Sequence, residues 1–240
     1  MMAPLVLGLS LLVQTNGPAA VAKLSALPDA FAKLQSFQMD VTMRASLEGM
    51  DSVVTTKVLA KRPNLYSIEQ TMRSAVENGT RRFVCDGKGL ALPEPKNPGR
   101  MILDPAPHSQ WEGSLRAISS VMYDNGWPLG VVFRPKKETL DFVRNLVNVH
   151  SLGKVEMEDG SQAERIVADA PAAVGEIGFQ VEVFIGADGF MRRMSLKSKT
   201  PQDMGPVESA SWVLIWDVKV TKDPNIPEGA FKLPPVRGRV

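Results

Sequence analysis

The sequence predicts a mainly β (α+β) fold, in which an antiparallel sheet forms an incomplete barrel and short helices act as a lid or plug. Apolar and polar residues alternate over many short segments, which is typical of half-buried antiparallel strands. Turn sequences rich in Gly, Asn and Asp separate these segments at hairpin spacing. Helical periodicity occurs only in short stretches that flank or interrupt the strands, which argues against α/β layouts.

The N-terminal segment has the features of a secretory signal. Residues 1–22 contain no Asp, Glu, Lys or Arg, and their apolar run at residues 5–13 is shorter than the roughly 20 helical residues that cross a bilayer. Ala20-Val21-Ala22 then supplies the small-x-small pattern that signal peptidase accepts. We therefore predict a cleaved signal peptide at residues 1–22, a single domain at residues 23–240 and a periplasmic location. No Lys or Arg precedes the apolar run, so a buried N-terminal helix is the alternative.

The first half of the domain should contain one helix and then consecutive strands. Leu24, Leu27, Phe31 and Leu34 recur at helical spacing, so they share one face of a helix that ends near Leu34. From Phe37 the period changes to two, which indicates a strand. The strands predicted in this half cover residues 37–47, 53–60, 65–72, 81–85 and 89–92, with a short edge strand at 100–103.

Helices should interrupt the strands in the middle of the chain. Five prolines between residues 93 and 107 disfavour central strands there. One amphipathic helix is predicted over residues 115–122, ended by Asn125-Gly126 and Pro128, and another begins near Lys136. The strands predicted after these helices cover residues 150–157, 163–169, 179–185, 190–199 and 210–220, followed by a proline-rich tail.

Composition argues against several classes of function. The formal net charge is +2 and the basic residues are scattered, so charge gives no sign of nucleic-acid binding. One cysteine and two histidines make a disulfide framework impossible and a metal site improbable, and we expect no cofactor. His108 and His150 have no nucleophile at a recognisable spacing, and there is no Gly-x-Ser-x-Gly motif. We therefore expect a protein that is not an enzyme.

Strand residues that would point to one apolar face form the candidate ligand site. They include flexible methionines and broad aromatic rings, which suit acyl chains. The candidate ligand-binding residues are Met39, Val41, Met43, Phe83, Val181, Met194, Trp212, Leu214 and Trp216. The alternative is a fully packed core, because an apolar face of a strand most often packs against other elements of the fold.

Several motifs, taken in their order along the chain, resemble one family. They are Leu34-Gln35-Ser36-Phe37, Lys61-Arg62-Pro63-Asn64-Leu65-Tyr66, Val84-Cys85-Asp86-Gly87-Lys88-Gly89-Leu90, Ile185-Gly186-Ala187-Asp188-Gly189 and Gly229-Ala230-Phe231-Lys232-Leu233-Pro234-Pro235. In order and spacing these motifs are similar to the LolA-like periplasmic lipoprotein carriers. The resemblance covers nearly all of residues 23–240, although residues 93–150 match only in placing helices there.

The resemblance implies an incomplete antiparallel barrel of about eleven strands with a helical lid. It also implies a monomeric carrier that binds the acyl chains of lipoproteins or lipids, takes them from an inner-membrane donor and passes them to an outer-membrane acceptor. Arg62 would lie near the cavity mouth and gate the lid through backbone carbonyls; the alternative is an ordinary solvated arginine. Related proteins of this fold sense lipids or lipoproteins without carrying them, so a sensor that controls a membrane partner is the alternative function.

Overall fold

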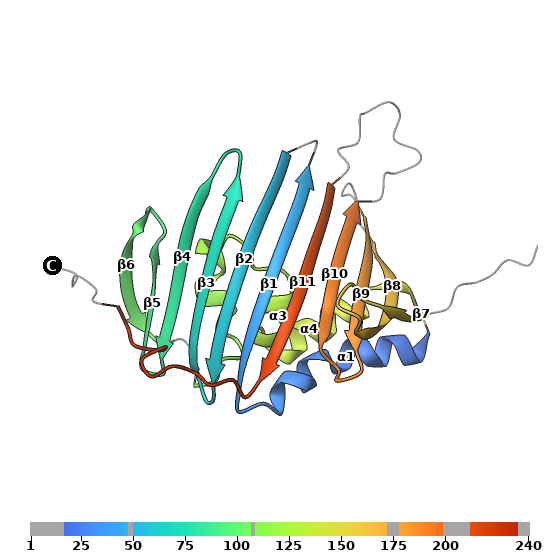
Figure 1. The fold of residues 1–240 in the computed structure, drawn as a ribbon, viewed down its shortest axis with the longest axis horizontal. Helices are drawn as coiled ribbons and strands as arrows, with labels where there is room; N and C mark the ends of the chain where they lie inside the picture. Colours follow the sequence, from blue (N-terminus) through green and yellow to red (C-terminus); the bar gives the residue numbers. More distant parts are fainter. Residues whose placement is uncertain (1–16, 48–49, 107–108, 172–177, 199–211, 235–240) are drawn as a thin grey trace, which may run out of the picture.

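The computed structural model describes residues 17–47, 50–106, 109–171, 178–198 and 212–234, and within them eleven antiparallel strands form one open sheet (Figure 1). The order across the sheet is β6-β5-β4-β3-β2-β1-β11-β10-β9-β8-β7. The strands of the first half are β1 Ser36–Leu47, β2 Met50–Lys61, β3 Leu65–Ser74, β4 Asn78–Asp86, β5 Gly89–Glu94 and β6 Asn97–Pro105. Those of the second half are β7 Val147–Glu156, β8 Gln162–Ala170, β9 Phe179–Gly186, β10 Met191–Ser198 and β11 Trp212–Lys222.

The chain order explains the sheet order. Within each half, consecutive strands pair with each other, and β1 joins the two halves by pairing with β2 on one side and β11 on the other. The turns after β4 and β9 contain Gly87 and Gly189 with φ of 89° and 83°, a conformation that glycine adopts without steric cost. The predicted antiparallel, mainly β fold is therefore confirmed, and the sheet does not close into a barrel.

All helices lie on one face of the sheet (Figure 1). They are α1 Pro18–Ala32, α2 Leu115–Ile118 with a 3-10 turn at Ser119–Val121, α3 Trp127–Phe133 and α4 Lys136–Arg144. The connection from β6 to β7 joins the two opposite edges of the sheet, so it has to cross this face. We call residues 109–146 the strap, and the face that it crosses the inner face.

The sequence does not predict helix α3, because Pro128 there indicates the end of the preceding helix. Proline is tolerated in the first turn of a helix, where no intrahelical partner for its nitrogen is needed, and Pro128 lies there. All seven residues of α3 are buried, so this helix has no polar face and no amphipathic period.

Helix α1 begins before the predicted signal-peptide cleavage point. Pro18 is in its first turn, Ala20 is 3% exposed, and Gly17 donates its backbone N–H to Val149 O at 2.6 Å. Leu24, Leu27 and Phe31 are buried, so the predicted apolar face of this helix is confirmed for them. The helix ends at Ala32, and Leu34 is buried just beyond it. Cleavage after Ala22 would remove the first five residues of α1, and the apolar run at residues 5–13 lies outside the described residues.

Candidate apolar binding site

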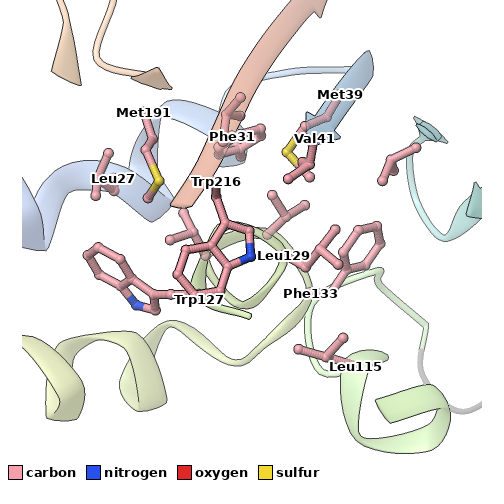
Figure 2. Close-up of a cluster of buried hydrophobic side chains, with 14 of the residues drawn as sticks. Leu27, Phe31, Met39, Val41, Leu115, Trp127, Leu129, Phe133, Met191 and Trp216 are labelled. Atoms are coloured by element: carbon pink, nitrogen blue, oxygen red, sulfur yellow. The ribbon is translucent and has the colours of Figure 1, made fainter. Parts of the chain in front are cut away.

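Most of the candidate ligand residues lie in the core between the sheet and the helices. Figure 2 shows Met39, Val41 and Trp216 pointing toward Leu129 and Phe133 of α3. The candidates that are at most 9% exposed are Met39, Val41, Met43, Phe83, Val181, Met194 and Trp216. All seven belong to one cluster of buried hydrophobic residues that also contains side chains of α1, α3 and α4, as the packed-core alternative describes.

The other two candidates, Trp212 and Leu214, lie where the strap does not cover the inner face. Leu214 pairs with Ala45 of β1 on one side and with Leu196 of β10 on the other, and all three are only half-buried. A cavity of about 420 Å³ opens beside them. It is lined by Ala45, Ser46, Met50, Asp51, Ser52, Met72, Ser74, Ala75, Val76, Trp212 and Leu214, which we call the groove. Its volume falls within the roughly 300 to 1,000 Å³ of small-molecule sites.

The rim of the groove exposes apolar side chains. Met50, at the start of β2, is 54% exposed, and Val76, between β3 and β4, is 87% exposed. Trp212, which lines the groove, also packs against Phe179 of β9, with the ring centroids 4.5 Å apart. Because large exposed apolar side chains rimming a hollow are a feature of binding surfaces, the groove is the strongest candidate site in the described part of the chain.

A buried polar network fastens the strap to the middle of the sheet. Gln70 of β3 is fully buried, and its Nε2 donates to Asp124 O at 2.6 Å and to Thr56 Oγ1 at 3.1 Å. Its Oε1 accepts the backbone N–H of Tyr123 at 2.9 Å and that of Asp124 at 3.4 Å. The amide of one side chain thus satisfies several backbone groups of the strap, which buried polar groups require.

Asp124 connects this network to the central strand β11. Its Oδ1 accepts the N–H of Gly126 at 2.8 Å, and its Oδ2 accepts the indole N–H of Trp216 at 3.0 Å. Burial raises the pKa of the Asp124 carboxyl, and these two hydrogen bonds reduce that rise. The strap is therefore fastened by an acid whose ionised form is poorly solvated.

Arg62 makes a second attachment, at the end of β2. Its Nη2 donates to the carbonyl of Ala32, the last residue of α1, at 3.3 Å. Its Nε donates to the carbonyl of Leu34, just beyond the helix, at 3.0 Å. It also binds Gln110 and Glu112 of the strap at 3.0 and 2.9 Å. The guanidinium lies 4.2 Å from the ring centroid of Trp111. These contacts include the backbone carbonyls that the sequence resemblance implies.

The position of Arg62 differs from the implied one, because Arg62 is not beside the groove. The groove lies at the Met50 end of β2, and Arg62 follows Lys61 at the other end, roughly 35 Å away along the strand. Residues 223–234 run along this far end (Figure 1), where Asp223 N–H donates to Ser36 O at 3.2 Å. Arg62 therefore fastens the covered end of the fold, and the groove opens at the opposite end.

The residues considered for catalysis are dispersed. His150 lies in β7 and Cys85 in β4, and Cys85 is fully buried with a thiol pKa raised by that burial. Glu158, between β7 and β8, pairs with Arg193 at 3.0 Å. Among the described residues, no group of three His, Cys, Asp or Glu side chains could hold a metal ion. His108 lies outside the described residues.

Sequence reasoning missed Gln70 and Asp124. Gln70 carried a usable signal, because it occupies an inward position between Ile68 and Met72 on the apolar face of its strand. A polar residue there needs a partner. Asp124 directly precedes Asn125-Gly126, where an acidic residue is ordinary turn chemistry, so the sequence gives no signal for its role.

Comparison with known proteins gives likenesses of fold. No protein-family model and no curated protein matches the chain. Similar solved structures include LprF from Mycobacterium bovis, 13% identical over 85% of this chain and 93% of that chain, with a TM-score of 0.46. The MucA/MucB complex of Pseudomonas aeruginosa is 11% identical over 90% of this chain and 61% of that chain, with a TM-score of 0.47. The LolA superfamily protein NE2245 from Nitrosomonas europaea is 12% identical over 90% of this chain and 96% of that chain, with a TM-score of 0.34. The similar structures thus include a member of the superfamily that the sequence motifs resemble.

Proposed function

We propose that this chain is an exported, non-catalytic carrier that binds the acyl chain of a lipid or lipoprotein in the groove. The observation that carries the proposal is the partly exposed apolar surface around Trp212 and Leu214, beside a cavity of about 420 Å³. Burial of acyl carbons contributes about 0.8 kcal/mol per CH₂, so a chain of ordinary length supplies enough free energy for micromolar binding.

The distribution of polar contacts supports entry at the groove end. Arg62 and the C-terminal tail fasten the far end of the sheet, and the Gln70 network fastens its middle. The groove end carries the exposed side chains of Met50 and Val76. Loading from an inner-membrane donor and release to an outer-membrane acceptor would then use this one opening. No helix of the described residues is long and apolar enough to span a membrane.

A fluorescent acyl probe tests the proposal. Parent protein should bind it at micromolar concentration or tighter. Leu214→Asn should weaken binding about five- to 150-fold, because an unpaired amide in an apolar site costs about 1 to 3 kcal/mol. Ile215→Asn is the matched control, since Ile215 is the next residue of β11, is also half-buried and points to the other face. A monodisperse protein that binds no probe, or equal affinities for both variants, would establish the packed-core alternative.

Export is tested separately, by sequencing the N-terminus of the mature protein. We expect Lys23 or a residue within a few positions of it. A start that preserves Gly17 and Pro18 would also preserve the hydrogen bond to Val149 and the first turn of α1. Intact cytoplasmic protein that retains Met1 would contradict export.

A further inference from the structure

The groove ends at a row of buried side chains on the inner face. Leu214 lines the groove and pairs with Ala45, and the next inward pair along the same strands is Trp216 with Met43. Two residues along a strand advance about 6.6 Å. Within that short distance Leu214 is half-buried, whereas Met43 and Trp216 are 9% and 3% exposed. Trp216 therefore lies directly beyond the inner end of the groove.

The strap holds the Trp216 ring in this position. Asp124 Oδ2 accepts the indole N–H at 3.0 Å. Gly126 lies so close that a Cβ added there would be 2.8 Å from Cζ2 of Trp216. A side chain at residue 126 would thus collide with the ring, and the glycine lets the strap backbone pack directly on it. The Trp216 ring is therefore held between the sheet and the strap, at the inner end of the groove.

We propose that Trp216 is the stop that sets the longest acyl chain the groove accepts, and that Asp124 is the positioning residue that holds the stop in place. This inference rests on the proposed function, because it concerns the length of the same ligand. A chain that enters past Met50 and Val76 runs along Leu214 and ends at the Trp216 indole. Carbons beyond that point stay in water and add no affinity.

A series of straight-chain fluorescent fatty acids of increasing length tests the proposal. In the parent protein, affinity should rise with length and then reach a plateau. Trp216→Leu should move the plateau to longer probes, and the longest probe should bind about fifteen-fold more tightly than to the parent, which corresponds to two further buried CH₂ groups. If Trp216→Leu does not fold, Trp216→Phe should also move the plateau to longer probes, but by a smaller amount.

Trp111→Leu is the matched control, because Trp111 is a fully buried tryptophan that packs on Phe37 and Arg62 at the far end of the fold. It should leave the plateau at the parent's probe length. Asp124→Ala should move the plateau to longer probes, as Trp216→Leu does. Asp124→Asn keeps an oxygen that accepts the indole N–H, so it should leave the plateau at the parent's probe length. An unchanged plateau in folded Trp216 variants that bind probe would overturn the inference alone. Absence of probe binding by the parent would overturn the proposed function and this inference with it.

Discussion

The indole nitrogen of Trp216 donates a 3.0 Å hydrogen bond to Asp124 Oδ2, although 92 residues separate the two in the sequence. This bond joins the central strand β11 to the strap that crosses the inner face. Gln70 of β3 binds the same turn of the strap through both the N–H and the C=O of residue 124. The strap is therefore held from two strands by polar groups buried inside an apolar core, where each broken bond is costly.

The raised pKa of Asp124 predicts how stability depends on pH. The folded state holds the Asp124 proton more tightly than the unfolded state, in which the pKa is near 3.9. The favourable contribution of this group is thus complete below about pH 3.9 and is lost as pH rises through the raised pKa. We expect the free energy of unfolding of the parent, relative to Asp124→Asn, to increase as pH falls through that window. Urea denaturation of both proteins at matched pH values measures the difference, and a difference that stays constant or declines would contradict the assignment.

Gln70→Leu should destabilise the fold by about 2 to 3 kcal/mol, because it leaves the backbone N–H groups of Tyr123 and Asp124 buried without their acceptor. The midpoint of urea unfolding measures the effect. Gln38→Leu is the control, since Gln38 lies on the outer face of β1, where its side chain donates to Asp40 at 2.7 Å. It should change stability by no more than about 0.5 kcal/mol. Equal effects of the two substitutions would show that Gln70 does not fasten the strap.

The strands could be predicted because apolar and polar residues alternate along each of them, and this alternation is visible in the sequence. From Trp212 to Val220 every second residue is apolar, and these residues do share the inner face of β11. The same local pattern cannot show which part of that face the helices cover. Val41 and Leu214 look alike in sequence, yet Val41 lies beneath α3 and Leu214 lines the groove. That distinction depends on the path of the strap, which contacts between distant residues determine.

Cys85 should be unreactive in the folded protein. Its side chain is fully buried in β4, and burial raises its thiol pKa, so little thiolate forms and reagents have no access. A chromogenic disulfide reagent should label the native protein at a rate limited by unfolding and should label the urea-unfolded protein at once. Because Cys85 is the one cysteine of the sequence, the signal has a single source. Rapid labelling in native buffer would show that the β4 region opens readily.

Arg62→Leu should loosen the covered end of the fold and alter cargo release. The substitution removes donors to Ala32 O and Leu34 O and the ion pair with Glu112, while the leucine still packs where the aliphatic stem was. Since these are charge-assisted hydrogen bonds on a guanidinium that is about one-fifth exposed, we expect a loss of about 1.5 to 3 kcal/mol in the free energy of unfolding. If α1 and the strap must separate from Arg62 when cargo enters and rejoin it on release, the variant should favour the loaded state. Transfer of a bound acyl probe to vesicles should then be slower than from the parent.

Arg44→Leu provides the comparison for this release measurement. Arg44 lies on the outer face of β1 and pairs with Asp217, so it is a charged strand residue with an ion pair that touches neither α1 nor the strap. Its loss should change stability by about 0.5 kcal/mol or less, as for other exposed pairs, and leave release at the parent's rate. Slow release confined to Arg62→Leu would support a gating role for the far end of the fold, even though the groove opens at the other end. Equal release from the parent and both variants would reduce Arg62 to a structural attachment and leave the groove as the whole of the binding site.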